Sequence, residues 1–366
     1  MKRKLYFLII VCALAIQAKA QKFTEWQDMQ VNEINRFAPH ASFFAYENKE
    51  KALKGDMNAS ENFLSLHGNW NFKWVENADQ RPTDFYKTDY NDKGWGTMKI
   101  PAIWEVNGFG DPIYVNIGFA WKGHFKNNPP YVPVKDNHVG SYRKIVKIPN
   151  SWDGKQIIAH FGSVTSKIYL WVNGQFVGYA EDRKMAAEFD VTSYLHSGDN
   201  LFAFQVFRWS DGSYCEDQDF WRLSGVARDS YLYARNKDVH VDDLQIKQSL
   251  TNNYKDGTLD IKAPATANTV IKYQLLDAQG KEMTMTGIQE TEENGVKSFK
   301  ATLPDCKRWT AETPYLYRLV ASVYAVKTTK KGRKTITQVA AEPTEVICQK
   351  IGFRKVEIKN AQLLVN

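Results

Sequence analysis

The segment from Arg208 to Trp221 (RWSDGSYCEDQDFW) concentrates side chains that can bind polar ligands. It holds four carboxylates and two tryptophans within fourteen residues. A carboxylate accepts hydrogen bonds from vicinal hydroxyl groups and coordinates hard cations through oxygen. An aromatic ring offers a flat apolar surface, either to a sugar or to a protein core. Asp219 has the alternative role of capping a turn in this loop. We expect three tryptophans to pack in the core rather than to face a sugar: Trp171, Trp209 and Trp221.

Short β-strands must position these side chains, because the sequence from Leu64 onwards consists of short apolar and aromatic runs broken by Gly, Asn, Asp and Pro. The clearest element is the hairpin Lys167–Tyr179 (KIYLWVNGQFVGY). Its two β-rich runs flank Asn173-Gly174, a pair that readily takes the positive φ angles of a type I′ turn. Many short strands without a long helical period predict a sandwich or jelly roll. Further strands are expected at residues 66–74, 141–148, 156–161, 189–192, 200–209 and 229–234.

A second series of strands starts near Val239 and fits an immunoglobulin-like sandwich, with a turn at residues 278–281. The basic cluster at residues 327–334 (KTTKKGRK) is interpreted as the solvated tip of a hairpin. Neither a recognition fold nor a one-sided basic stripe is present in the sequence, so no nucleic-acid partner is expected. The strands of this series are expected at residues 243–248, 258–262, 270–277, 297–303, 315–324 and 344–350.

The predicted fold class is therefore all-β, a jelly-roll (galactose-binding-like) sandwich followed by an immunoglobulin-like β-sandwich. The expected boundaries are a signal peptide at residues 1–20, a polar, irregular N-terminal arm at 21–63, the jelly roll at 64–236, the second sandwich at 237–350 and a connecting stub at 351–366. Such an arm needs a host surface on which to pack.

The first twenty residues have the features of a secretory signal peptide. A basic start precedes an apolar run that is too short to span a bilayer comfortably, and Ala18-Lys19-Ala20 provides a small-x-small cleavage site. Removal of this segment takes away four basic residues and lowers the formal net charge from +7 to +3. We expect an exported protein, periplasmic or extracellular, with no membrane anchor after cleavage.

Three cysteines remain after that cleavage, and their odd number and wide spacing predict neither a disulfide framework nor a zinc site. Cys306 and Cys348 both fall in the second domain, so one disulfide between them and three free thiols are both compatible with the sequence. Export with few disulfides favours a bacterial periplasm.

Several strings together resemble family 2 glycoside hydrolases of the bacterial β-galactosidase type. The long string at residues 208–221 is similar to a segment of that family's sugar-binding jelly roll, and residues 309–317 (WTAETPYLY) are similar to a motif of its immunoglobulin-like domain. Residues 351–356 (IGFRKV) resemble the bridge into its catalytic barrel. Shorter matches occur in the same order at residues 111–116 (DPIYVN), 128–133 (NPPYVP), 171–174 (WVNG) and 177–179 (VGY).

The resemblance implies contacts with a β-galactoside sugar. Asp219 matches an aspartate that reaches from the jelly roll into the active site, where it contacts galactose hydroxyls and a sodium ion. Asn116 matches a substrate-contacting asparagine, and Ile117 lies beside it as an apolar wall. These three residues are the expected sugar contacts, and Na⁺ near Asp219 is the expected monovalent ion.

The resemblance also implies a divalent cation, Mg²⁺ or Ca²⁺, where the arm meets the jelly roll. Acids clustered at one point repel unless a cation neutralises them. This sequence departs from the family's pattern at three of the positions: Glu25 replaces an Asp, Asp28 an Asn and Glu181 a Gln. The alternative to a bound cation is therefore that the site is lost. The matching positions are Glu25, Asp28, the Val31 carbonyl, Glu181 and Asp211.

In that family a (β/α)₈ barrel carries both catalytic glutamates, and a retaining mechanism needs two carboxyls about 5 Å apart. Only 16 residues follow Lys350, against roughly 250 for such a barrel. Asn32-Glu33 matches the family's Asn-Glu pair only superficially and is interpreted as a surface carboxylate. We therefore expect the N-terminal portion of a β-galactosidase without catalytic residues of its own, with the missing barrel portion or a second copy of the chain as its protein partner. The alternative is a stand-alone carbohydrate-binding or assembly module.

Overall fold

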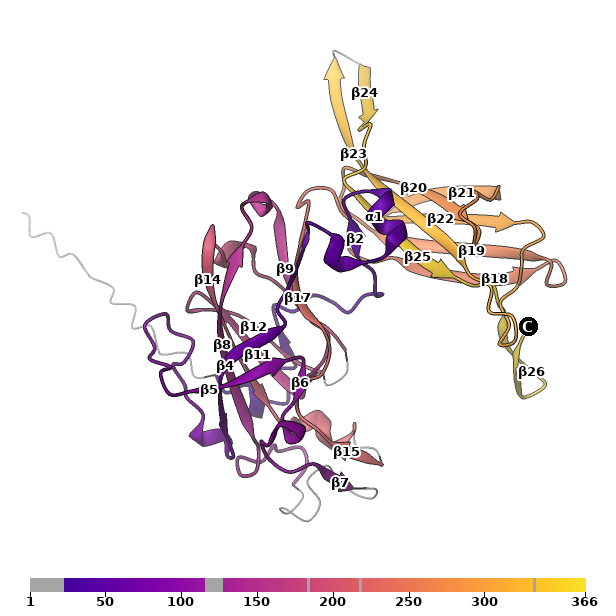
Figure 1. Ribbon diagram of the computed structural model, residues 1–366. Helices are drawn as coiled ribbons and strands as arrows, with labels where there is room; N and C mark the ends of the chain where they lie inside the picture. The colour runs from indigo at the N-terminus through magenta and orange to yellow at the C-terminus, as the bar shows by residue number, and fades with distance from the viewer. Residues whose placement is uncertain (1–22, 116–127, 183–184, 217–218, 332–333) are drawn as a thin grey trace, which may run out of the picture.

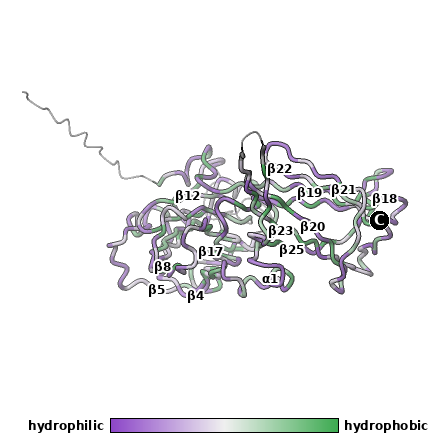
Figure 2. The backbone as a smooth tube through the Cα atoms, turned by 90° about the horizontal axis from the view of Figure 1, so that it is seen from above, coloured by the Kyte–Doolittle hydropathy of each residue, from purple (hydrophilic) through white to green (hydrophobic). Residues whose placement is uncertain are grey.

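A computed structural model describes residues 23–115, 128–182, 185–216, 219–331 and 334–366. It contains two β-sandwiches joined by a short connection, with the N-terminal arm lying against both of them (Figure 1). This confirms the predicted fold class. In Figure 2, hydrophobic and hydrophilic stretches alternate along both sandwiches. Among the described residues no helix is long and apolar enough to cross a membrane.

The jelly roll is built from two antiparallel sheets that pack face to face. The larger sheet has the order β1 (Glu33–Ile34), β12 (Gln175–Glu181), β11 (Lys167–Val172), β14 (Gly198–Phe207), β8 (Val139–Ile148), β4 (Gly68–Val75) and β5 (Gly96–Ile100). The smaller sheet has the order β13 (Ala187–Asp190), β9 (Gln156–Phe161), β17 (Ser230–Arg235) and β3 (Phe63–Ser65). Short pairings extend the domain: β10 (Val164–Thr165), β16 (Gly225–Val226) and β6 (Ala102–Ile103) form one set, and β7 (Ile113–Val115) pairs with β15 (Phe220–Arg222).

The Asn-Gly hairpin forms as predicted. Asn173 and Gly174 have φ angles of 50° and 80°, as a type I′ turn requires, and the turn joins β11 directly to β12. Every residue of β11 is buried. The reason is that the larger sheet is covered on both faces, by the smaller sheet on one side and by the arm and the segment between β4 and β5 on the other. A strand covered on both faces is a nearly continuous apolar run, and the sequence of β11 has that form after its first residue, Lys167.

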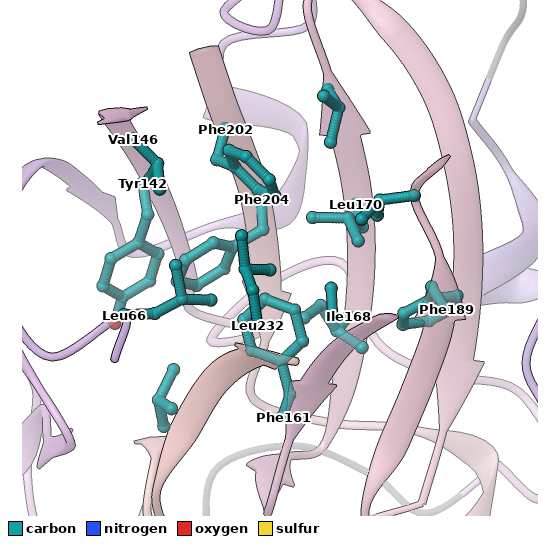
Figure 3. Packing of buried hydrophobic residues seen from close by; sticks show 14 of the residues in the cluster. Leu66, Tyr142, Val146, Phe161, Ile168, Leu170, Phe189, Phe202, Phe204 and Leu232 are labelled. Carbon is teal, nitrogen blue, oxygen red and sulfur yellow. The ribbon is translucent and has the colours of Figure 1, made fainter. Parts of the chain in front are cut away.

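The core between the two sheets is rich in aromatic rings. Phe204 stacks on Tyr142 with ring centroids 4.3 Å apart, and Phe161 of the opposite sheet meets Phe204 edge-on at 5.3 Å. Figure 3 shows these rings together with Leu232 between the sheets. Burial of such side chains is the main stabilisation of a sandwich of this kind.

The second sandwich also has two antiparallel sheets. One has the order β18 (Gln245–Thr251), β19 (Asp256–Pro264), β22 (Val296–Leu303) and β21 (Thr286–Glu293). The other has the order β2 (Ala45–Tyr46), β25 (Glu345–Ile351), β23 (Tyr317–Lys331) and β20 (Thr269–Leu276), with β24 (Lys334–Val339) paired to β23 as a projecting hairpin. The strands β26 (Val356–Lys359) and β27 (Gln362–Val365) form a hairpin of their own.

The arm is less irregular than the sequence predicts. It contains the helix α1 (Lys49–Lys54), which Asn48 caps by accepting a hydrogen bond from the Lys51 amide, and which ends at Gly55 with a φ of 69°. Its strand β1 joins the jelly roll through β12, whereas its strand β2 joins the second sandwich through β25. The arm therefore connects the two sandwiches independently of the main connection.

The three cysteines of the described residues are free thiols. Cys306 belongs to the core of the second sandwich, whereas Cys348 packs beside a different cluster that includes Tyr46 and Val320. The two open alternatives for these residues are thereby resolved in favour of free thiols.

Candidate functional site

Of the three predicted sugar-contacting residues, Asp219 lies at the ribbon formed by β7 and β15. Asp219 directly precedes β15, and the register of the ribbon places Trp221 opposite Tyr114. Asn116 and Ile117, which would continue from the end of β7, lie outside the described residues. The ribbon protrudes at one end of the jelly roll (Figure 1), so the structure places Asp219 on a solvent-exposed edge.

The ribbon presents aromatic rings to solvent. Tyr114 and Trp221 meet edge-on with ring centroids 5.4 Å apart, and the exposed fractions are 53% for Tyr114, 58% for Phe220 and 48% for Trp221. The prediction that Trp221 packs in the core is therefore wrong, because a two-stranded ribbon has no second sheet to cover it. The same prediction is confirmed for Trp171 and Trp209, which are 1% and 3% exposed.

Asp219 is oriented by a hydrogen bond from the Tyr114 hydroxyl. This hydrogen bond to the carboxylate raises the pKa of Tyr114, so the tyrosine remains a neutral donor over the physiological range. An exposed carboxylate held beside aromatic faces can accept hydrogen bonds from sugar hydroxyls while the rings cover the apolar face of the sugar. The ribbon therefore has the chemical groups that carbohydrate recognition uses.

A buried arginine fixes the ribbon to the jelly roll. Arg208, only 2% exposed, donates from Nη2 to the carbonyl oxygens of Asp111 at 3.0 Å and Arg222 at 3.2 Å. Asp111 precedes β7 and Arg222 ends β15, so one guanidinium holds the base of both strands. Its Nη1 lies 2.9 Å from His138 Nδ1. The predicted segment at residues 208–221 thus combines an anchoring residue at its start with exposed groups at its end.

The residues predicted to bind a divalent cation lie where the arm meets the jelly roll, but they do not converge on one point. The Glu25 carboxylate accepts a hydrogen bond from the Tyr169 hydroxyl at 3.1 Å. Asp28 is exposed, and its Oδ1 accepts from the Gln30 amide within its own turn at 3.0 Å. Val31 is half-buried beside the aromatic cluster under the arm. Within the described part of the chain, no group of three or more acidic, histidine or cysteine side chains is arranged to hold a metal ion.

Glu181 and Asp211 do come together, with a lysine between them and the arm. Asp211 begins a 3₁₀ turn (Asp211–Tyr214) that follows β14 after three intervening residues, and its carboxyl is hydrogen-bonded to that of Glu181 at the end of β12. Lys167 Nζ of β11 lies 2.9 Å from Glu181 Oε1 and donates to the Trp26 carbonyl oxygen of the arm. Burial is the main cause that raises the pKa of Glu181, to about 8; Lys167 opposes this rise, and the hydrogen bond to Asp211 contributes to it. Burial lowers the pKa of Lys167, and Glu181 opposes that shift.

A second cluster joins the arm to the other sheet of the jelly roll. Glu188 of β13 lies 2.6 Å from Nδ1 of His160 on β9 and 2.8 Å from Nε2 of His40 in the arm. Tyr231 stacks on His160 with ring centroids 4.3 Å apart. The cluster lines a cavity of about 1070 Å³ between the arm and the two sandwiches. Of the predicted site residues that the structure describes, none lines this cavity.

Two functional residues were missed by sequence reasoning. Tyr114 lies within the quoted string at residues 111–116, but only its partner strand reveals that it orients Asp219. The sequence predicts Lys167 only as the first residue of a hairpin. Two features of the sequence could have identified this lysine. It lies in an otherwise apolar strand, and the chain has the acids Asp28 and Glu181 where the family has neutral residues.

Comparisons with known proteins agree with this architecture. The model described as "Glycosyl hydrolases family 2, sugar binding domain" matches residues 63–236, and the one described as "Glycosyl hydrolases family 2" matches residues 239–354. The chain therefore belongs to glycoside hydrolase family 2.

Among its relatives, a β-galactosidase of Priestia megaterium is 35% identical over 360 residues, which cover 95% of this chain and 34% of that protein. A β-galactosidase of Halalkalibacterium halodurans is 34% identical over 353 residues, which cover 95% and 33%. The chain thus spans about a third of the length of these curated relatives.

Solved structures share the fold at low sequence identity. A β-glucuronidase from Bifidobacterium dentium superposes with a TM-score of 0.61 at 17% identity, over 83% of this chain and 50% of that one. A β-glycosidase from Bacteroides vulgatus superposes with a TM-score of 0.56 at 18% identity, over 83% and 35%. At such identities the likeness concerns the fold and not the substrate.

Proposed function

We propose that this chain is the N-terminal portion of a β-galactosidase, in which it forms the scaffold and one wall of the sugar site for hydrolysis of terminal β-D-galactosides. The observation that carries the proposal is the match, over 95% of this chain, to about a third of the length of β-galactosidases. Both catalytic glutamates would then be provided by a barrel outside these residues, so this chain alone is inactive. Its partners are β-galactosides together with that barrel portion or a second copy of the chain.

The ribbon supports the sugar-contacting role. Its Asp219 carboxylate would accept hydrogen bonds from galactose hydroxyls, with Asn116 and Ile117 completing that wall. Asp219 also has the ligand type that Na⁺ takes, but one carboxylate is an incomplete set of oxygens, so the remaining ligands would come from the sugar and from other residues. The protein would act outside the cytoplasm, in the periplasm or the medium, after cleavage of residues 1–20.

A stand-alone carbohydrate-binding module is the second candidate, because the exposed carboxylate and rings of the ribbon already form an accessible surface in this chain. The two proposals share sugar contact at Asp219 and differ in whether the chain works with a catalytic barrel. Sequencing the gene beyond codon 366 separates them: an in-frame barrel with two catalytic glutamates supports the first proposal, and a stop codon supports the second.

Activity and binding are tested on the purified chain. We expect no hydrolysis of a chromogenic β-galactoside, and weak saturation-transfer NMR signals from methyl β-galactoside that disappear in Asp219→Asn. The matched control is Asp153→Asn, an exposed aspartate away from the ribbon. Sugar release by the purified chain would refute its proposed inactivity. An NMR signal that survives Asp219→Asn, or is absent from the unmodified chain, would refute the role of the ribbon.

A further inference from the structure

A lysine side chain is fully buried at the joint between the arm and the jelly roll. Lys167 is 1% exposed. Its side chain lies on the same face of the larger sheet as Tyr169 and Trp171, beneath the arm. Burying an ammonium group is unfavourable unless it is paired and hydrogen-bonded. Here Nζ has a carboxylate oxygen of Glu181 at 2.9 Å and the carbonyl oxygen of Trp26 as acceptors, with Asp211 close enough to attract it.

The two acceptors of this ammonium and the carboxyl of Asp211 that attracts it come from three separate segments. Trp26 belongs to the arm, Glu181 to the end of β12 and Asp211 to the turn after β14. These are the segments from which the family's divalent cation would draw its ligands. The amine therefore lies where the arm meets two carboxyl groups that share a hydrogen bond, and its single positive charge balances the one negative charge that such a pair retains.

The remaining predicted ligands are engaged elsewhere. Tyr169 accepts a hydrogen bond from the Trp26 amide at 2.9 Å and lies 3.1 Å from the Glu25 carboxylate. Asp28 is exposed and bonded within its own turn. Mg²⁺ and Ca²⁺ take about six or more oxygen ligands, some of which are water, but a protein site for them needs carboxylates that converge on one point. Among the described residues, no three acidic, histidine or cysteine side chains converge in this way. The donor set of this joint does not fit such an ion while Lys167 is present.

We propose that the Lys167 ammonium is the built-in cation of the arm joint and replaces the divalent metal there. The lysine is covalently attached, so the arm docks at a strength that does not depend on the concentration of free metal. This inference concerns the arm joint alone and is independent of the proposed function of the ribbon.

The first test compares thermal unfolding of the full chain in EDTA, in MgCl₂ and in CaCl₂ at constant ionic strength. We expect the same melting temperature in all three solutions, because an ion that binds only the folded state would raise it. A melting temperature several degrees higher with either metal than with EDTA would overturn the proposal. This comparison needs no variant, so it stands even where a substitution prevents folding.

The second test uses variants at residue 167. Lys167→Ala removes the charge and leaves space between Glu181 and Asp211, so we expect a melting temperature several degrees lower in EDTA and a partial recovery with Mg²⁺ or Ca²⁺. Lys167→Met removes the charge but fills the space, and we expect no recovery with metal. The matched control, Lys144→Ala, changes a lysine of the same sheet that bonds the His67 carbonyl oxygen, and it should respond to neither metal nor EDTA. A Lys167→Ala protein as stable in EDTA as the unmodified chain would refute the role of the ammonium.

Discussion

Replacement of Glu188 by glutamine tests how the arm is attached to the smaller sheet. In the folded protein this carboxylate bonds two imidazoles, His160 beside it in the sheet and His40 in the arm. Glutamine keeps the size of the side chain but removes its charge. Because the carboxylate side chain is only 7% exposed, little solvent screening weakens these bonds.

The magnitude follows from the shifted ionisation of the carboxylate. Burial alone would raise the pKa of Glu188, but the hydrogen bonds from His160 and His40 outweigh burial and lower the pKa to about 2, from 4.5 for the free side chain. That difference corresponds to about 3 kcal/mol of stability. Since the folded-state pKa is lowered, this contribution is present above pH 4.5 and is lost as the pH falls towards 2. It depends on the attraction of protonated His40, so it also weakens at higher pH, where His40 loses its proton.

The contribution of His40 to stability depends on pH in the opposite direction. Its hydrogen bond to Glu188 raises its pKa above 6.5, against the effect of burial, and the nearby Asp243 adds to the rise. A raised pKa stabilises the fold below pH 6.5, and that contribution is lost as the pH rises through the folded-state pKa. The difference in stability between the unmodified chain and Glu188→Gln should therefore be largest between pH 4.5 and 6.5.

The assay is urea unfolding followed by tryptophan fluorescence at about pH 5.5 and about pH 8.5. We expect Glu188→Gln to lose about 3 kcal/mol at the lower pH and clearly less at the higher pH. The control is Glu292→Gln, which removes an exposed partner of Lys297 and should change stability by less than about 0.5 kcal/mol. Equal losses at both pH values, or no loss at the lower one, would refute the reasoning.

Three further substitutions test the core and the ribbon. Gly140→Ala would place a methyl group 2.5 Å from Trp104 Cζ2, and we expect a loss of about 1–3 kcal/mol from overpacking in urea unfolding; an unchanged midpoint would contradict the packing described. Phe204→Ala removes a large side chain from the centre of the jelly-roll core, and calorimetry should show that the free energy of unfolding falls by about 3–5 kcal/mol. A fall of less than about 1 kcal/mol would show that the surrounding side chains close the space without leaving a cavity. Arg208→Met removes the anchor of the ribbon, so backbone amides of β7 and β15 should exchange hydrogen faster while those of β14 do not, and equal protection in both proteins would argue against the anchor.

Local sequence signals predicted the strands well. The Asn173-Gly174 turn fixes its hairpin through positive φ angles that depend on two residues alone. The helix α1 was missed because six residues are too few for a periodic pattern, and packing against β25 stabilises it instead. The strand β21 was also missed, because all of its residues are exposed and it carries no apolar alternation.

The site was predicted in its composition but not in its contacts. Resemblance identified Asp219 and the acids of the arm joint, whereas the Tyr114 hydroxyl and the Lys167 amine were found only after the strands had been paired. Trp221 shows the physical reason. The alternating sequence around Trp221 is compatible with a strand face that is buried and with one that is exposed. The face is exposed because no second sheet covers the described ribbon.

Because the arm pairs with both sandwiches, its two strands can find their partner strands only at different times during synthesis. The segment around β1 finds its partner strand once residue 181 has emerged, but the Ser42 carbonyl bonds Gln349, which lies 307 residues further along. At about 5–20 residues per second, ribosomal elongation separates these two residues by roughly 15–60 s. Throughout that interval β2 has no neighbouring strand, so it docks on β25 only after every strand of the jelly roll has been made.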